Sequence, residues 1–312
     1  MIIREAKQED IDSIVVLLQA SLGESLLKKS SEIWNFKHVL NPFGASIVLL
    51  AEEDKALIGV RAFMTWRWQI GNEIWNAYRA VDTATHPNHQ GKGIFKKLTF
   101  QALDKIHEKG DCFVFNTPND QSRPGYLKMG WQEVEKIKVA LVPTFFYALP
   151  NLFSKIKIEN TISPMQLEVL CETHNRALAT NDLLFTPKSI SYLKWRYEEN
   201  PLQTYFVYST PDCYVAMYVK KQRFFNELRV VEVIGNHDFK INKNIRKAII
   251  SCAVKNKCYL ITVANQYLFA FSMYGHFGPK LTFKSLTNNV IFDVKAININ
   301  NWKYSLGDLE LF

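Results

Sequence analysis

The chain has 312 residues, of which 47% are hydrophobic, so it is long enough for two packed domains and its composition argues against disorder. Its five cysteines are scattered and have no histidine cluster beside them, which argues against a disulfide framework or a zinc site. No apolar run reaches transmembrane length and the N-terminus lacks a signal-peptide pattern. We therefore expect a cytoplasmic protein that has no membrane partner.

The net charge of +8 is carried by the second half of the chain. Residues 1–150 contain 18 Lys and Arg against 17 Asp and Glu, whereas residues 151–312 contain 20 against 13. A basic half could attract an anionic partner. However, no block of basic residues accompanies aromatic platforms, as a nucleic-acid groove requires. We expect these lysines to maintain solubility, and we expect no nucleic-acid partner.

The first 85 residues predict one strand, then two helices, then three further strands. Residues 2–4 are expected to form a strand and residues 7–22 a helix with one apolar face. A second helix is expected to be capped near Ser30 and to end near 41–44. Strands are then predicted at 46–52, 56–70 and 74–85, with turns between them.

The most informative segment is Thr85-His86-Pro87-Asn88-His89-Gln90-Gly91-Lys92-Gly93-Ile94-Phe95, which joins the third of these strands to a helix. Residues 93–109 have apolar side chains at helical spacing. Gly91 and Gly93 permit a tight turn whose amide N–H groups stay uncovered. These amides and the positive end of the helix dipole form a socket that suits phosphate oxygens.

A second segment about thirty residues further on strengthens this interpretation. It follows a predicted strand at 112–116 and runs Asn119-Asp120-Gln121-Ser122-Arg123-Pro124-Gly125-Tyr126-Leu127-Lys128-Met129-Gly130-Trp131.

Together the two segments resemble the acyl-CoA site of the GNAT superfamily of N-acetyltransferases. Residues 90–93 stand in the first four places of the family pattern Gln/Arg-x-x-Gly-x-Gly/Ala, and the 119–131 segment has the family's spacing of Asn, a small residue, Tyr, Gly and an aromatic. Phe95 departs from the pattern, which usually has Gly or Ala there. The resemblance covers residues 1–140 and implies an α/β (α+β) fold. Its central mixed sheet is flanked by helices, and two strands splay apart to admit the pantetheine arm.

The second half of the chain predicts a similar order of elements. Helices are expected at 164–179, 187–197 and 242–255, and strands at 204–208, 214–220, 228–234 and 258–263. We therefore predict a GNAT domain at 1–145, a connection at 146–163 and a degenerate, non-catalytic GNAT-like domain at 164–312. Residues 239–244 lack the glycine turn, and Phe271 stands in the tyrosine position. The aromatic run 145–147 is expected to pack between the domains.

The resemblance implies a role for each site residue. The co-substrate implied is an acyl-CoA, most directly acetyl-CoA, and no metal is implied. Tyr126 is the candidate general acid, with a core tyrosine as the alternative. Lys92 could add charge at the phosphates, and the amides of the splayed strand could polarise the thioester carbonyl. The cofactor-binding residues implied are Thr83, Ala84, Thr85, Gln90, Gly91, Lys92, Gly93, Ile94, Phe95, Asn119, Ser122 and Tyr126.

The general base is less clearly indicated. Asp82 is an ionisable group in an otherwise apolar-to-neutral strand, and we expect burial to raise its pKa toward a useful value. A salt-bridged or sheet-edge aspartate is an equal alternative. Glu73, His86 and His89 are weaker candidates, and a water chain could replace any of them.

The function implied is an acyl-CoA-dependent N-acyltransferase, most directly an acetyl-CoA:amine N-acetyltransferase. The alternatives are a non-catalytic acyl-CoA sensor or scaffold, and a tandem aminoacyltransferase acting on cell-wall peptides. Enzymes of this last kind usually lack the glycine turn. The acceptor could be a small-molecule, sugar or peptide amine. The oligomeric state is not indicated.

Overall fold

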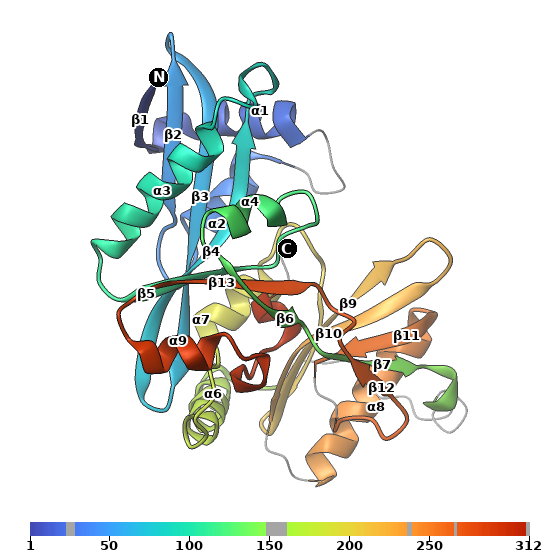
Figure 1. The fold of residues 1–312 in the computed structure, drawn as a ribbon. Coiled ribbons are helices and arrows are strands. Elements are labelled where there is room, and N and C mark those ends of the chain that lie inside the picture. Colours follow the sequence, from blue (N-terminus) through green and yellow to red (C-terminus); the bar gives the residue numbers. More distant parts are fainter. Residues whose placement is uncertain (23–28, 148–160, 236–238, 265–266, 310–312) are drawn as a thin grey trace. The chain divides into compact units, whose positions relative to one another are not determined.

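The computed structural model describes residues 1–22, 29–147, 161–235, 239–264 and 267–309 (Figure 1). The chain folds into two compact units, and neither is continuous in sequence. Unit 1 comprises Met1–Trp68, Glu73–Val134 and Leu281–Ile297, and unit 2 comprises Gln69–Asn72, Glu135–Lys280 and Asn298–Phe312.

Unit 1 is built on a seven-stranded mixed sheet with the order β1-β2-β3-β4-β5-β13-β6. Neighbours β1 and β2, and β2 and β3, are antiparallel, β4 and β5 are parallel, and β13 is antiparallel to β5. The strands are β1 (Ile2–Glu5), β2 (Ile47–Glu53), β3 (Ala56–Ile70), β4 (Glu73–Thr85), β5 (Cys112–Asn116), β6 (Gln132–Lys136) and β13 (Lys280–Leu286). The mixed α/β class predicted from the sequence is confirmed.

Helix α3 (Ile94–His107) lies across β2 and β3 and covers the core of this sheet (Figure 1). Its buried residues recur at helical spacing and pack on Leu49, Ala51 and Phe63. Gly59 permits the close approach, since a Cβ there would lie 2.8 Å from Ile94. The other helices of unit 1 are η1 (Gln8–Asp10), α1 (Ile11–Leu22), α2 (Ser31–His38), η2 (Pro87–His89), α4 (Arg123–Lys128) and α9 (Val290–Ala296).

Strands β4 and β5 separate halfway along β4. Their pairing runs from Asn76↔Cys112 to Arg79↔Phe115 and then stops, while β4 continues to Thr85. Asp82 has a φ of +38°, which is rare for a residue with a side chain and kinks the part of β4 that no longer pairs with β5. The opening leads directly to the glycine turn.

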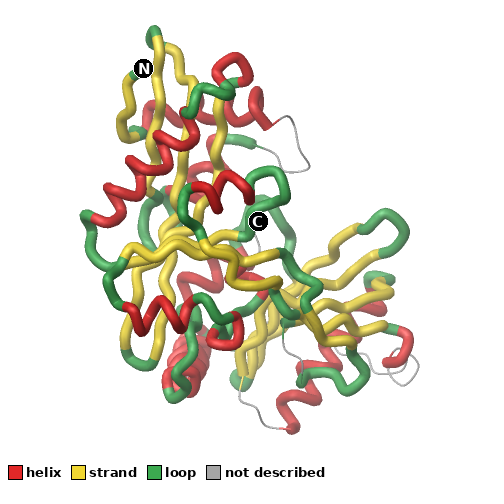
Figure 2. Tube along the Cα trace, in the orientation of Figure 1, coloured by secondary structure: helices red, strands yellow, loops and turns green. Residues whose placement is uncertain are grey.

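Unit 2 contains a six-stranded sheet with the order β12-β7-β11-β10-β9-β8, and α8 packs on β9, β10 and β11 (Figure 2). Strands β10 and β11 are parallel and are joined through α8, as β4 and β5 are joined through α3. The strands are β7 (Val139–Pro143), β8 (Phe206–Thr210), β9 (Cys213–Lys221), β10 (Asn226–Gly235), β11 (Cys258–Val263) and β12 (Met273–Gly275). The helices are α6 (Pro164–Ala179), α7 (Ile190–Leu193), a π-helical turn η3 (Lys194–Glu198), α8 (Phe239–Lys255), η4 (Ile299–Asn301) and α10 (Leu306–Leu309).

Two segments differ from the contiguous division expected from the sequence. Residues 281–297 lie in unit 1, because β13 pairs with β5 and Phe292 of α9 stacks on Trp75 with ring centroids 3.8 Å apart. Residues 135–145 lie in unit 2, where β7 pairs with both β11 and β12. Most of the expected connection at 146–163 lies outside the described residues.

Candidate active site

The glycine turn between β4 and α3 has the geometry that the sequence predicts. Gly91 and Gly93 have φ angles of +77° and +74°, and a Cβ on either would meet no atom within 4 Å. Within the described part of the chain, the backbone N–H groups of residues 91–93 donate no hydrogen bond. The first N–H groups of α3 are likewise unpaired by helix geometry. The turn therefore presents several amide donors to an open surface, as an anion site requires.

The side chains of the turn hold its shape. Gln90 donates to the carbonyl of Thr85 at 3.4 Å, and His86 Nδ1 accepts the N–H of Asn88 at 3.3 Å. His89 Nδ1 lies 3.2 Å from a carboxylate oxygen of Glu53. Both histidines are thus engaged in the turn and in neighbouring contacts, whereas Lys92 stays exposed. The exposed ammonium of Lys92 can add a charge to the amide donors.

The side chains of Ile94 and Phe95 point into the core, so the exposed surface of the turn is formed by its backbone. Ile94 is buried against β3, and the ring of Phe95 packs edge-on against Tyr126 with centroids 5.8 Å apart. The departure from the family pattern at Phe95 thus places an aromatic ring beside the candidate acid. No atom of this ring lies within 4 Å of a Cβ placed on Gly91 or Gly93.

Tyr126 is buried beneath this ring and is held by Arg61. The Arg61 guanidinium donates to the Tyr126 hydroxyl at 2.9 Å and also to the hydroxyl of Thr83. Arg61 is fully buried among Phe63, Phe95 and Tyr126, and no carboxylate pairs with it in the described parts of the chain. Since the hydroxyl oxygen accepts from Arg61, its own hydrogen is directed elsewhere. That hydrogen has no acceptor among the described residues.

Asn119 and Ser122 bond to each other. The Asn119 side-chain oxygen accepts from the Ser122 N–H and from its hydroxyl, both at 2.9 Å. This closes the turn that leads into α4 and positions Tyr126 one helical turn later. The Asn119 oxygen is therefore occupied locally, and both residues shape the site through the backbone.

Thr83, Ala84 and Thr85 form the end of β4 that does not pair with β5. Thr83 accepts from Arg61, and the Thr85 carbonyl accepts from Ser21 at 3.1 Å. Ala84 is buried. These hydrogen bonds connect the end of β4 to β3 and α1 and hold it in place.

Asp82 is ionised and paired. Its carboxylate bonds to Lys37 and lies 2.9 Å from His38 Nε2, while His38 Nδ1 lies 2.8 Å from Ser46. Burial alone would raise the pKa of Asp82, but the ammonium of Lys37 and the His38 ring together hold it well below its usual range. The expectation of a raised pKa is wrong, because the sequence did not show these partners. So acidic a group is a poor acceptor for an amine proton.

Glu73 lies at the opposite end of β4. It is exposed at the first residue of the strand, roughly 35–40 Å from Thr85 at the usual rise per strand residue. Glu73 therefore does not belong to the site. Arg61, Lys37 and His38 do belong to it, and sequence reasoning missed all three. The one available signal was a charged residue, Arg61, in the middle of a long apolar strand.

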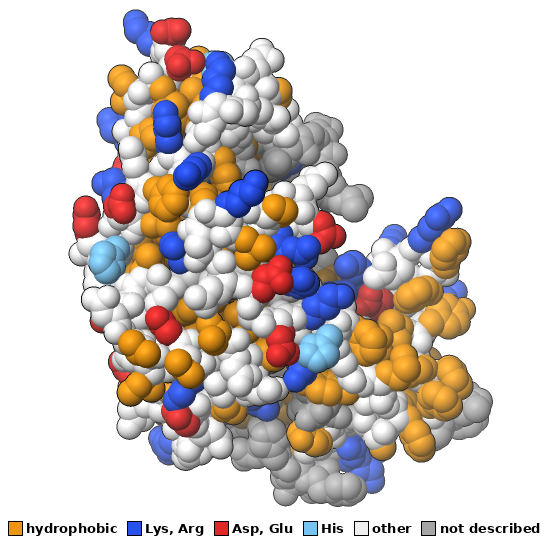
Figure 3. Space-filling view, in the orientation of Figure 1, with side chains coloured by type: hydrophobic (Ala, Val, Ile, Leu, Met, Phe, Trp, Pro, Cys, Tyr) orange, Lys and Arg blue, Asp and Glu red, His pale blue; other side chains and the backbone are white. Residues whose placement is uncertain are grey.

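The aromatic run 145–147 and Phe271 are surface features of unit 2. Phe145 and Phe146 are 64% and 52% exposed, and Tyr147 packs on Phe269. Phe271 is 67% exposed and so does not occupy a tyrosine-like core position. Figure 3 shows the hydrophobic side chains that gather on this face of unit 2.

No three or more His, Cys, Asp or Glu side chains in the described ranges are grouped closely enough to hold a metal ion. In the same ranges, no helix has the length and apolar character needed to cross a bilayer.

The family follows from this geometry and from a direct sequence match. Residues 2–134 match the family model described as an acetyltransferase (GNAT) domain. This part of the chain, which carries the glycine turn and Tyr126, is a GNAT acetyltransferase domain. None of the curated proteins matches the sequence significantly.

Solved structures share the fold over most of the chain. A GCN5-related N-acetyltransferase from Anabaena variabilis ATCC 29413 is 13% identical with a TM-score of 0.65, over 92% of this chain and 73% of that one. One from Kribbella flavida is 13% identical with a TM-score of 0.63, over 91% and 71%. Eis1 from Mycobacterium abscessus is 12% identical with a TM-score of 0.57, over 96% and 76%. At these identities the likeness concerns the fold alone.

Proposed function

We propose that unit 1 binds an acyl-CoA, with acetyl-CoA as the favoured one, and transfers the acyl group to a small-molecule, sugar or peptide amine. The observation that carries this proposal is the left-handed turn at Gly91 and Gly93, which presents unpaired amide donors beside the opening between β4 and β5. The CoA phosphates would be held by these amides and by Lys92. The strand opening at residues 83–85 would receive the pantetheine arm.

The reaction is direct attack of the amine on the thioester carbon. A C–N bond forms, the C–S bond breaks, and the thiolate takes a proton from Tyr126. The hydroxyl of Tyr126 suits this role because its oxygen already accepts from Arg61 and its hydrogen remains available. The positive charge of Arg61 stabilises the phenolate that remains after the transfer. Arg61 is thus a positioning residue for the acid.

Asp82 has a different part in this proposal. Its pairing with Lys37 and His38 stabilises the kinked backbone of β4, and the amine proton passes to water. Asn119 and Ser122 hold the start of α4 in the same supporting way.

Unit 2 is a degenerate GNAT-like domain in this proposal. Support comes from three antiparallel strands followed by a helix and a parallel strand, the order that unit 1 also has. Its α8 is preceded by a sequence without the glycine pair of the unit 1 turn. We therefore assign one acyl-CoA site to each chain.

A turnover experiment tests the proposal and separates it from a sensor role. The full chain is mixed with acetyl-CoA and a panel of amino sugars, polyamines and peptide amines, and release of free CoA thiol is followed. Amine-dependent thiol release that is lost in Tyr126→Phe supports the proposal. Binding of acetyl-CoA without release for any amine favours a sensor, and absence of binding contradicts both roles.

A further inference from the structure

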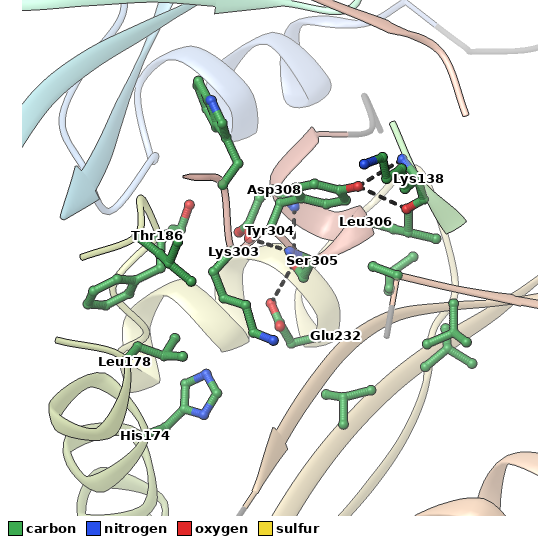
Figure 4. Close-up of a pocket in the computed structure, with 18 of the residues that line it drawn as sticks. Lys138, His174, Leu178, Thr186, Glu232, Lys303, Tyr304, Ser305, Leu306 and Asp308 are labelled. Atoms are coloured by element: carbon green, nitrogen blue, oxygen red, sulfur yellow. Dashed lines mark hydrogen bonds between the residues drawn. The ribbon is translucent and has the colours of Figure 1, made fainter. Parts of the chain in front are cut away.

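Unit 2 contains a cavity of about 430 Å³, within the usual range of ~300–1,000 Å³ for small-molecule sites. Every lining residue belongs to unit 2. The walls come from α6, β10, the start of α8 and the segment around η4 and α10 (Figure 4). The glycine turn of unit 1 and its acyl-CoA site are not part of this cavity.

The cavity lies where the sheet of unit 2 opens. The parallel pairing of β10 with β11 ends at Val230↔Val263, while β10 continues to Gly235. Its register against β9 also shifts between Val230 and Glu232. Residues on both sides of this opening line the cavity. Strand openings and bulges of this kind often border binding sites.

The carboxylates in the wall are already satisfied. Lys188 Nζ lies 2.8 Å from both Glu232 and Asp308. Ser305 donates to Glu232 through its hydroxyl and to Asp308 through its N–H. Tyr192 and Tyr197 donate to Asp308 and Glu232 in turn. A cationic ligand would therefore have to compete with a complete set of bonds.

The lysines at the opening of the cavity are not satisfied in this way. Lys303 points into the cavity (Figure 4), and its ammonium has no hydrogen-bond or ion-pair partner among the described residues. Its backbone is fixed, because its N–H donates to Leu184 at 2.6 Å. Lys138 bonds at 2.8 Å only to a neutral group, the amide oxygen of Asn300. The residue Lys303 is exposed, and partial desolvation of its ammonium by the cavity lowers its pKa.

The remaining wall is mixed, because polar side chains such as His174, Thr186 and Asn242 line it together with apolar ones. Leu178, Val230, Ile245 and Val263 contribute apolar side chains to it. An occupant with one anionic group could pair with Lys303, and an apolar body could contact these side chains. A polyphosphate such as CoA is disfavoured, because no glycine turn supplies an array of amide donors.

We propose that this cavity is a second ligand site, which takes a small monocarboxylate with an apolar body through Lys303. Ligand binding at this site does not depend on the acyl-CoA site or on acyl transfer in unit 1. It would allow unit 2 to bind a substrate part or an effector that unit 1 does not recognise.

Calorimetry on the full chain with octanoate as probe tests this site, with octylamine and acetate as comparison probes. Octanoate should bind at one per chain, whereas octylamine lacks the anion and acetate lacks the apolar body. Lys303→Met should weaken octanoate binding at least tenfold. The control Lys221→Met removes an exposed lysine of β9 and should change nothing.

The position of the site is tested in the variant Gly93→Val, which alters the turn of unit 1. Octanoate binding should persist there, so failure of this proposal is distinguishable from failure of the acyl-CoA proposal. Absence of octanoate binding, equal binding of octylamine, loss of binding in Gly93→Val or unchanged affinity in a folded Lys303→Met variant would each overturn the proposal.

Discussion

Removing the hydroxyl of Tyr126 tests the chemical step most sharply. The ring is 5% exposed and packs between Phe95 and Trp131, so phenylalanine fills the same space. General acid catalysis typically contributes ~10²–10⁴-fold, and we expect Tyr126→Phe to lower kcat by that factor. The affinity for acetyl-CoA should change little, because the proton is transferred only as the thiolate departs.

The same substitution has a cost in stability that the structure allows us to estimate. The hydroxyl accepts one hydrogen bond from the buried Arg61, whose Nε and second terminal nitrogen already lack partners. Removing an acceptor from a buried donor costs about 1–3 kcal/mol, so the free energy of unfolding should fall by this amount. Activity must therefore be measured well below the unfolding temperature of the variant.

Thiol release with an active amine, together with calorimetry for acetyl-CoA, separates the two effects. Tyr78→Phe is the matched control, since Tyr78 is also 5% exposed, lies in the same core and sits on the paired half of β4. It should keep kcat within a few-fold of the original. If folded Tyr126→Phe retains the original kcat, Tyr126 is a packing residue and the assignment of the acid is refuted.

Three further predictions concern charged and reactive groups. Asp82→Asn should lower kcat less than tenfold. The folded-state pKa of Asp82 is depressed, so its carboxylate stabilises the fold above the unfolded pKa near 3.8, and this stabilisation is lost as the pH falls below that value. In denaturant unfolding, Asp82→Asn should therefore lower the free energy of unfolding by about 1.5–3 kcal/mol at pH 7, and this difference should vanish in acid. Lys188→Met should lower the free energy of unfolding by about 3–5 kcal/mol at pH 7, because two buried carboxylates lose their cation. This loss should become smaller as lower pH protonates the carboxylates, and an equal loss at all pH values would contradict the prediction. Burial raises the pKa of Cys112 to about 12 and that of Cys258 to about 11. A thiol reagent at pH 8 should therefore modify these two thiols only after the protein has unfolded.

Local sequence signals predicted unit 1 well wherever neighbouring residues determine structure. The spacing of apolar residues predicted α3, and Ser30 caps α2 through the N–H of Ile33 as expected. The glycines at 91 and 93 predicted left-handed backbone, because few other residues adopt it readily. In unit 2, Ser189 caps α7, so the helix predicted at 187–197 begins only at Ile190.

Features made by distant residues were not predictable in this way. Thr282 of β13 pairs with Asn116 of β5, 166 positions away in sequence, and no local pattern specifies that partner. The same applies to Asp82, whose pKa depends on Lys37 and His38 from α2. The cavity of unit 2 is likewise assembled from segments separated by more than a hundred residues. Local propensity therefore indicated the elements and the turn, and tertiary pairing decided the protonation states and the second site.

The central claim is that the left-handed turn at Gly91 and Gly93 forms the single acyl-CoA site of this chain. Calorimetry of acetyl-CoA against the original protein, Gly93→Val and the control Gly71→Val tests it directly. Gly71 also has a positive φ and open space around it, but it lies in the turn between β3 and β4. We predict one acetyl-CoA per chain in the original protein and in Gly71→Val, and no measurable binding in folded Gly93→Val. Two sites per chain, or unchanged binding in Gly93→Val, would contradict the claim.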